Sequence, residues 1–133
     1  MGMAIEAMAA KGRAARPVVR VPAAESDPSG KAAHEQGAKL DDGKVQADLL
    51  EDFGLALLEV AKVGTFGAKK YSRGGWQHVE QGVTRYNAAK WRHILKGRYE
   101  THDPDSGLLH AAHEAWNALA KLELMLRDKG LSC

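Results

Sequence analysis

Three segments of this chain carry apolar residues at intervals of three and four, and no segment shows the strict alternation of a half-buried strand. The segments cover about residues 45–63, 83–95 and 106–128. Each predicts a helix with one apolar face, and such a face must be covered by another element. We therefore expect an all-α fold, a helical bundle of three to four main helices.

The predicted helices differ in the length of their apolar faces. The first offers Leu49, Leu50, Phe53, Leu57, Leu58 and Val60, the second Tyr86, Ala89, Trp91 and Ile94, and the third Leu109, Ala112, Trp116, Leu119, Leu122 and Leu126. Gly64 and Gly67 predict that the first helix loosens at its end, and Gly97 is expected to end the second. Ser106 is a candidate N-cap, so we expect the third helix to begin near that residue.

The N-terminal region differs in composition from the helical segments. It is rich in Ala, Gly, Pro, Lys and Ser, and it shows no sustained helical or strand period. We expect residues 1–36 to form a flexible or extended arm and residues 37–133 to form the helical domain. Apolar residues make up 44% of the chain but concentrate after residue 45. Because a core of this size often needs a partner subunit, we expect a homo-oligomer, a dimer or tetramer, to complete the bundle.

Composition also excludes several classes of protein. The 19 Lys and Arg residues nearly balance the 17 Asp and Glu residues, and a formal charge of only +2 argues against a protein that coats nucleic acid. No run of 18 apolar residues exists, so we expect no membrane span. Cys133 is the single cysteine, which excludes an intramolecular disulfide and favours a cytoplasmic location.

Four polar side chains share one side of the third predicted helix. His110, His113, Glu114 and Asn117 stand at positions i, i+3, i+4 and i+7. Imidazole and carboxylate groups at this spacing can reach one metal ion, and bundle cores often hold such sites. The alternative, which these residues alone leave open, is that both histidines are half-buried and hydrogen-bonded without a metal.

Carboxylates supply further candidate ligands. Asp103 and Asp105 flank a proline just before the third helix, which is more acidic character than capping requires. Mg²⁺ and Mn²⁺ prefer oxygen ligands, so these two side chains suit a hard cation better than the histidines do. Glu59 lies in an otherwise apolar run of the first helix and, unless it is simply exposed, needs Lys62 or a metal ion as a partner.

A glycine-rich basic loop follows the first predicted helix. Lys69 and Lys70 precede Tyr71, and Trp76 follows two glycines. Cations beside aromatic rings fit phosphate contacts together with base stacking. The loop does not match a Walker A sequence, and the chain has neither a dinucleotide glycine fingerprint nor a C-x-x-C zinc pattern.

Two sequence motifs stand out in combination: Phe-Gly-Ala-Lys-Lys-Tyr, at residues 66–71, and Asp-Pro-Asp-Ser-Gly-Leu-Leu-His-Ala-Ala-His, at residues 103–113. Supporting motifs are Gly-Ala-Lys-Leu-Asp-Asp-Gly-Lys at 37–44, Arg85-Tyr86, Arg92-His93 and Lys96-Gly97. Together these motifs resemble the phage-type dATP/dGTP diphosphohydrolases, which are MazG-like members of the all-α nucleoside triphosphate pyrophosphohydrolases. The resemblance runs over about residues 37–126 and does not include residues 1–36.

The resemblance implies hydrolysis of dGTP or dATP between the α and β phosphates, which gives the monophosphate and pyrophosphate. It also implies two or three Mg²⁺ or Mn²⁺ ions, a phage role in nucleotide-pool management and a location in the host-cell cytoplasm. We map the catalytic residues to Glu59 and Asp105, and the metal ligands to Glu59, Asp103, Asp105, His110 and His113. Nucleotide contacts are assigned to Lys69, Lys70, Tyr71, Trp76, Arg85, Arg92 and Asn117.

One departure from the MazG pattern bears on the metal site. MazG relatives commonly carry a Glu-Glu-x-x-Glu cluster on one helix, and here only Glu59 occupies a comparable place. The resemblance therefore implies a metal shell that partly differs from that of its relatives, with His110 and His113 either as ligands or as groups that orient the carboxylates.

Two other functions remain open at the level of sequence. An HD-type phosphohydrolase would use His93, His102 and Asp103. A non-catalytic helical interaction protein would use the charged helix faces to bind a partner and would not bind a nucleotide.

Overall fold

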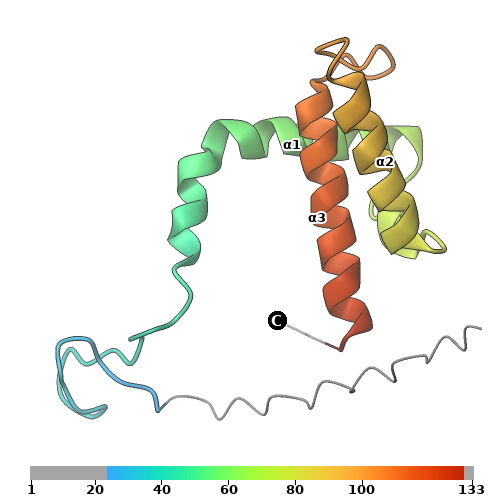
Figure 1. Cartoon of the computed structure of the whole chain (residues 1–133). Helices are drawn as coiled ribbons and strands as arrows, with labels where there is room; N and C mark the ends of the chain where they lie inside the picture. The colour runs from blue at the N-terminus through green and yellow to red at the C-terminus, as the bar shows by residue number, and fades with distance from the viewer. Residues whose placement is uncertain (1–23, 131–133) are drawn as a thin grey trace, which may run out of the picture. The chain divides into compact units, whose positions relative to one another are not determined.

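The computed structural model describes residues 24–130, and the contacts of the chain divide it into two units, Met1–Val45 and Gln46–Cys133. The second unit contains η1 (Ala47–Phe53), α1 (Gly54–Lys70), η2 (Gly75–His78), α2 (Gly82–Lys96) and α3 (His110–Asp128), as Figure 1 shows. Over residues 24–130 there is no strand, only an isolated bridge between His102 and Leu109, so the predicted all-α class is confirmed. None of the helices in that range is both long and apolar enough to cross a membrane.

Residues 24–45 form a loop that turns around a single carboxylate. Asp27 accepts hydrogen bonds from the backbone N–H groups of Ser29 and Lys39, both at 2.6 Å, and from the Ser29 hydroxyl. These donors, the hydroxyl first, lower the pKa of Asp27 below its ordinary value. The described part of the predicted arm is therefore a hydrogen-bonded loop, whereas residues 1–23 of that arm lie outside the described residues. The predicted domain boundary at residue 37 stays a prediction.

Helix α1 continues past the residue at which the sequence predicts its end. The expected end was Val63 with loosening at Gly64 and Gly67, but α1 runs to Lys70. A Cβ atom at Gly64 would lie 2.6 Å from Cζ3 of Trp116, so the missing side chain lets α1 approach α3 closely. Gly64 therefore serves helix packing and does not weaken the end of the helix.

Two other predicted boundaries are also corrected. The segment expected to be one helix over 45–63 divides into η1 and α1, which meet at Phe53 and Gly54. Helix α3 begins at His110 with Leu109 in the N-cap position, not near Ser106. Gly107 has a φ of 72°, which a right-handed helix cannot include, so the helix can begin only after it.

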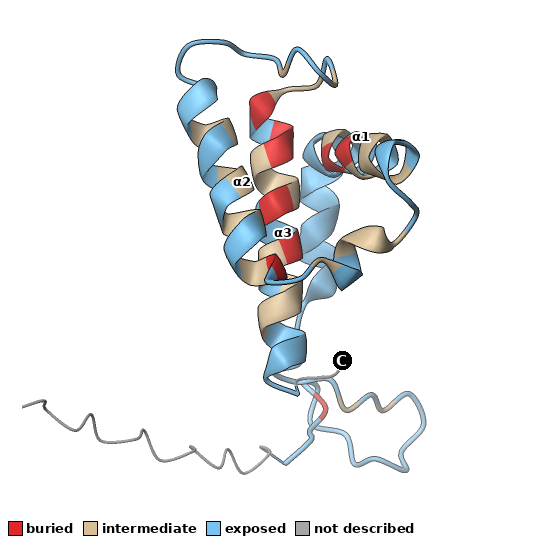
Figure 2. Cartoon of the chain, turned by 90° about the vertical axis from the view of Figure 1, so that its right-hand side faces the viewer, coloured by how far each residue is buried: buried red, intermediate tan, exposed pale blue. Residues whose placement is uncertain are grey.

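Helix α3 packs against both α1 and α2, more extensively against α2, and its buried positions are mostly polar. The apolar residues buried in the described part of the chain are Val60, Val63, Ala112 and Ala120. His110, His113 and Asn117 are also buried, and they lie along the same helix as Ala112 and Ala120 (Figure 2). A polar face therefore occupies much of the interior of this small bundle.

Part of the predicted apolar core is exposed. Leu119, Leu122 and Leu126 of α3 are exposed, and so is Trp91 of α2. Helix α1 crosses α3 only over the N-terminal half of α3 (Figure 1). The leucines in the C-terminal half of α3 are therefore not covered by α1. The apolar side chains of η1 and early α1 also remain exposed.

The close approach at Gly64 gives a testable difference between two glycines of one helix. We expect Gly64→Ala to destabilise the fold by about 1–2 kcal/mol, because the new methyl group forces the Trp116 ring to move. Gly67→Ala is the matched control, since a Cβ there meets nothing within 4 Å, and it should stabilise the helix by up to about 1 kcal/mol. Chemical denaturation measures both. Equal effects of the two substitutions would contradict the packing role of Gly64.

Candidate active site

A solvent-open cleft of about 1530 Å³ lies between the C-terminal half of α1, the following loop, α2 and the N-terminal half of α3. Its basic lining residues are Lys69, Lys70, Arg73, Arg85, Arg92 and Lys96. The carboxylates among its lining residues are Asp103 and Asp105. A concave site with this excess of positive charge favours an anionic ligand.

Nearly all of the residues predicted from the sequence meet at this cleft. Its lining includes Lys69, Lys70, Tyr71, Trp76, Arg85, Arg92, Asp103, Asp105, His113 and Asn117. His110 lies next to the cleft, in contact with His93. Glu59 is not brought to the cleft, because it lies earlier on α1 and pairs with Lys62 at 2.6 Å. The predicted catalytic and metal-binding roles of these residues stay predictions.

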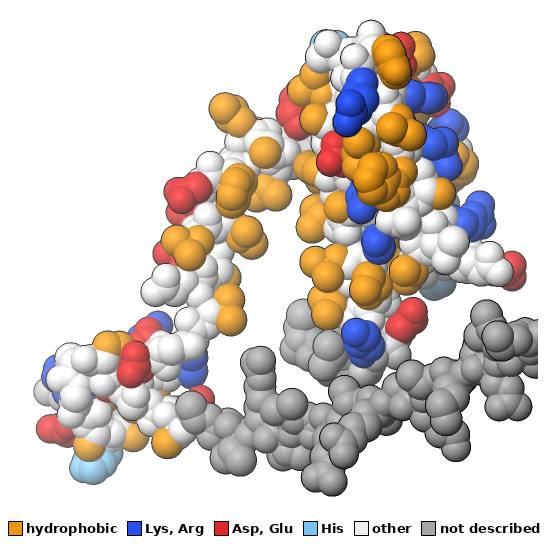
Figure 3. Space-filling model, viewed as in Figure 1, with side chains coloured by type: hydrophobic (Ala, Val, Ile, Leu, Met, Phe, Trp, Pro, Cys, Tyr) orange, Lys and Arg blue, Asp and Glu red, His pale blue; other side chains and the backbone are white. Residues whose placement is uncertain are grey.

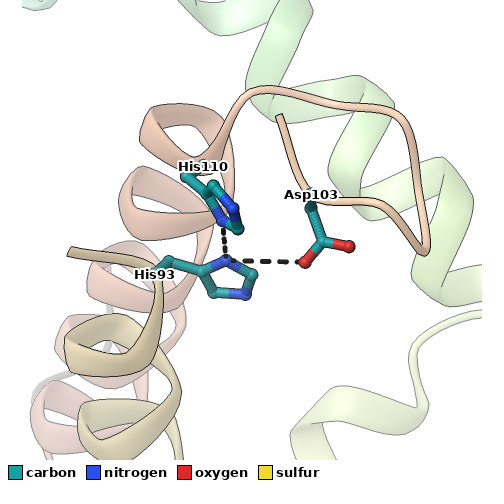
Figure 4. Close-up of side chains that lie close together, drawn as sticks. All are labelled: His93, Asp103 and His110. Carbon is teal, nitrogen blue, oxygen red and sulfur yellow. Dashed lines mark hydrogen bonds and ion pairs between the residues drawn. The ribbon is translucent and has the colours of Figure 1, made fainter. Parts of the chain in front are cut away.

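The centre of the site is a cluster of His93 from α2, Asp103 from the loop before α3, and His110 from α3 (Figure 4). The Nδ1 atoms of His93 and His110 are 2.9 Å apart, and His93 Nδ1 lies 3.7 Å from Asp103 Oδ2. One ligand atom from each of the three residues lies within 4.8 Å of the other two. Imidazole nitrogens and a carboxylate oxygen at these distances can hold one divalent ion.

Two neighbouring groups fix the orientation of the histidine rings. Glu100 Oε1 lies 3.0 Å from Nε2 of His110, so this nitrogen donates to the carboxylate. The His113 ring stacks on the His93 ring at 4.4 Å with an angle of 7°, and Nε2 of His113 bonds the hydroxyl of Ser106 at 2.6 Å. His113 therefore supports the cluster through stacking, and its Nε2 atom is already engaged by Ser106.

Asp103 also organises the loop that carries it. Its Oδ1 atom accepts hydrogen bonds from the backbone N–H groups of Asp105, at 2.7 Å, and Ser106, at 3.3 Å. Burial alone would raise the pKa of Asp103, but these backbone donors and the nearby histidines hold the pKa below its ordinary value. Asp103 is therefore a carboxylate at neutral pH, with Oδ2 directed toward His93.

His93 and the His113 ring stacked on it are neutral at physiological pH. Burial, with the adjacent His113 as a second cause, lowers the pKa of His93 to about 4. Burial likewise lowers the pKa of His113, against the opposing effect of Asp103. A neutral imidazole has one nitrogen lone pair free to accept a hydrogen bond or bind a metal ion.

An ion pair stands at the edge of the cleft. Lys70 Nζ donates to Asp105 Oδ2 at 2.8 Å, and this bond raises the pKa of Lys70. The lysine also lies 5.7 Å from the ring centre of Phe66 and 5.5 Å from that of Tyr71. Both charged side chains are largely exposed, so the pair can separate when an anion competes for the lysine.

The aromatic residues of the cleft are mutually packed. Trp76 contacts Tyr86 and Trp116 edge to face, with ring centres 6.4 and 6.2 Å apart. The guanidinium of Arg127 lies 5.5 Å from the Trp76 ring centre. Asn117 donates its side-chain amide to the His113 carbonyl at 2.8 Å, which leaves its side-chain oxygen free among the contacts of the described residues. Tyr71 is mostly exposed and has the least confined ring of the cleft.

From the sequence, His93 has a chemical role only in the alternative HD-type function, although Arg92-His93 is one of the family motifs, and Glu100 has no role. The signal for His93 was its position on α2, where Gly82, Tyr86, Ala89 and His93 recur at helical spacing on the inner side. Glu100 gave no such signal, because it reaches His110 through the fold of the connecting loop. The HD-type alternative is only partly assembled, since His93 and Asp103 meet but His102 is exposed and does not belong to the cluster.

Comparison with known proteins identifies the family. Residues 34–132 match the family model described as dATP/dGTP diphosphohydrolase, N-terminal. The chain belongs to this family. The resemblance expected from the motifs at 66–71 and 103–113 is therefore confirmed.

A relative extends the comparison to a curated protein. A protein from Salmonella phage PMBT28, named dATP/dGTP diphosphohydrolase, is 38% identical to the chain over 80 residues, which cover 59% of this chain and 26% of that protein. The chain thus spans about a quarter of the relative's length. No solved structure matches the chain.

The two aspartates of the loop should differ in their effect on stability. We expect Asp103→Ala to lower the free energy of unfolding by about 1–3 kcal/mol, because two backbone N–H groups lose their acceptor in a partly buried turn. Asp105→Asn should change stability by less than about 1 kcal/mol, because it weakens only an exposed ion pair. Thermal and urea denaturation monitored by circular dichroism compare them. A larger loss of stability in Asp105→Asn than in Asp103→Ala would show that the turn depends on the carboxylate of Asp105 and not on that of Asp103.

Proposed function

We propose that this chain hydrolyses the purine deoxynucleoside triphosphates dGTP and dATP to the monophosphate and pyrophosphate. The observation that carries the proposal is a cleft lined by six basic side chains together with His93 and Asp103, which form a cluster with the adjacent His110. Hydrolysis of a triphosphate requires cationic groups beside the phosphate oxygens and an acid-base or metal centre at the reacting phosphorus. The family description and the name of the phage relative supply the substrate class.

A divalent ion, Mg²⁺ or Mn²⁺, supplies charge neutralisation and an activated water in chemistry of this kind. Among the predicted ligands, Asp103 offers the carboxylate oxygen that such a hard ion prefers, and His110 lies beside it. Two or three ions are proposed, with Asp105, His113 and Glu59 as further predicted ligands. Glu59 would need a change of its pairing with Lys62 to take part.

The basic residues bind the phosphate groups in this proposal. Lys69, Lys70 and Arg92 contact phosphate oxygens, and their charges stabilise the negative charge that the leaving pyrophosphate carries. Lys70 leaves Asp105 for the phosphate, which frees the Asp105 carboxylate to accept a proton from the attacking water. In this proposal, the transfer of Lys70 from Asp105 to the phosphate makes Asp105 available as the general base only when the substrate is bound.

The nucleoside occupies the aromatic end of the cleft. Tyr71 is exposed and offers a face for stacking, and Trp76 closes the wall behind it. The free side-chain oxygen of Asn117 can accept a hydrogen bond from the sugar or base, and Arg85 lines the same cleft. The proposed setting is nucleotide-pool management by a phage in the host-cell cytoplasm, in keeping with the phage origin of the relative.

Product analysis tests the activity. Incubation of the full chain with a panel of nucleoside triphosphates and Mg²⁺ or Mn²⁺ should release pyrophosphate from dGTP and dATP, as measured by chromatography. Asp105→Asn should lower kcat by about 10²–10⁴-fold, the usual contribution of a general base, without unfolding the protein. His102→Ala is the control and should leave turnover nearly unchanged. Release of orthophosphate, or loss of activity in His102→Ala, would favour an HD-type phosphohydrolase instead.

We also propose that the chain forms a homo-oligomer, a dimer or tetramer, through its exposed apolar residues. Hydrophobic side chains gather along η1 and early α1 (Figure 3), where Leu49, Leu50, Phe53, Leu55, Leu57 and Leu58 are all exposed. Only four apolar residues are buried in the described part of the chain, which is a small core for a bundle. A second copy would cover this surface.

Light scattering after size-exclusion chromatography tests the oligomer. The double substitution Leu50→Glu with Phe53→Glu should convert the wild-type oligomer to a monomer, because each buried carboxylate would lack a partner. Leu95→Glu on α2 is a matched control, since Leu95 is similarly exposed but lies on another helix, and it should leave the mass unchanged. A monomeric wild-type protein would contradict the proposal.

A further inference from the structure

The donor set of the cluster distinguishes between classes of metal ion. Its two nitrogens and one oxygen come from His93, His110 and Asp103. Mg²⁺ prefers six oxygen ligands, several of them water, whereas imidazole groups suit Zn²⁺, Co²⁺ and Fe²⁺. A site dominated by nitrogen therefore does not match the ion that phosphate chemistry alone would suggest.

The separations between the donor atoms fit the small coordination sphere of such an ion. Two ligands about 2.0–2.1 Å from a tetrahedral ion lie about 3.3 Å apart. The two imidazole Nδ1 atoms are 2.9 Å apart and the His93–Asp103 pair is 3.7 Å apart, so these two separations fall on either side of that distance. The ligand atoms of all three residues lie within 4.8 Å of one another.

Hydrogen bonding also supports metal binding by His110. Glu100 engages Nε2 of His110, so the atom of this ring available to an ion is Nδ1, which faces His93. Nδ1 of His93 lies opposite it and close to Asp103, so both rings direct one nitrogen toward the place where an ion would bind.

We propose that His93, Asp103 and His110 form a transition-metal site for a dication such as Zn²⁺, Co²⁺ or Fe²⁺, and that Glu100 positions His110 for it. Three protein ligands leave at least one coordination position open, as in catalytic metal sites. His93 and Asp103 line the same cleft as the basic residues, so an ion held by them would be beside those residues. The role of this ion toward a phosphate rests on the proposed function, whereas its binding does not.

Metal titration without any nucleotide tests the site. The full chain is treated with a chelator, dialysed and titrated with Co²⁺, whose visible absorption reports nitrogen ligands and coordination number. We expect one equivalent of Co²⁺ to bind with visible absorption bands, Zn²⁺ to displace it, and millimolar Mg²⁺ to leave it bound. A folded wild-type protein that binds no Co²⁺, or that loses it to Mg²⁺, overturns the proposal.

Matched variants connect the binding to these residues. His93→Gln and Asp103→Asn should each weaken Co²⁺ binding by more than the roughly 10–100-fold typical of an outer-sphere change. Asp103→Asn keeps an amide oxygen for the Asp105 and Ser106 N–H groups, so it decides the question if His93→Gln does not fold. His102→Gln, an exposed histidine adjacent to Asp103, is the control and should bind as wild type. Equal affinity in all three variants overturns the assignment.

Glu100→Gln tests the positioning role separately. It removes the carboxylate that holds His110 and should weaken Co²⁺ binding by about 10–100-fold, with the shape of the absorption spectrum and the circular dichroism preserved. An unchanged affinity would overturn the role of Glu100. Absence of Co²⁺ binding by the wild-type protein with hydrolysis intact would overturn the metal site alone, and Co²⁺ binding by the wild-type protein without any hydrolysis would overturn the proposed function alone.

Discussion

The contact between His93 of α2 and His110 of α3 is the interaction on which the site depends. It joins two helices through polar side chains at a position where a bundle of this size would ordinarily bury aliphatic ones. Polar groups can be fully buried only if each finds a partner, and no side-chain nitrogen or oxygen atom that is completely shielded from solvent among residues 24–130 lacks one. Glu100, Ser106 and Asp103 supply these partners from the loop between the helices.

That requirement links the loop to the helix that follows it. Asp103 turns the chain with backbone hydrogen bonds from Asp105 and Ser106, and Gly107 then adopts a left-handed conformation that delays the start of α3 to His110. The same aspartate presents its second oxygen to His93. Asp103 therefore both shapes the loop and gives the site a negative charge. Asp103→Asn removes the charge but keeps an acceptor for the backbone N–H groups, whereas Asp103→Ala removes both. Comparison of the two variants therefore separates the structural effect from the chemical one.

The arrangement leaves little apolar surface inside the bundle. With His110, His113 and Asn117 on its inner face, α3 has only small apolar residues, Ala112 and Ala120, at its buried positions. Gly64 compensates by letting α1 approach Trp116 at close range. The exposed leucines of η1, α1 and α3 show that hydrophobic burial within one chain is incomplete, which is the physical basis for proposing a second copy.

Helical period was sufficient to predict the all-α class, the sequence motifs carried the family resemblance, and most of the site residues predicted from the sequence do line the cleft. These properties are local, because period and motif are read from neighbours in the chain. The sequence did not predict that α1 continues to Lys70 or that α3 begins at His110. It offered Lys62 as one of two partners for Glu59, and it placed His93 with Asp103 only in the HD-type alternative, so the fold decided between these possibilities. It did not predict that Glu100 would hold His110 or that His110 would join His93 and Asp103 in one cluster. These features depend on where separate elements meet in space, and only the tertiary structure determines that.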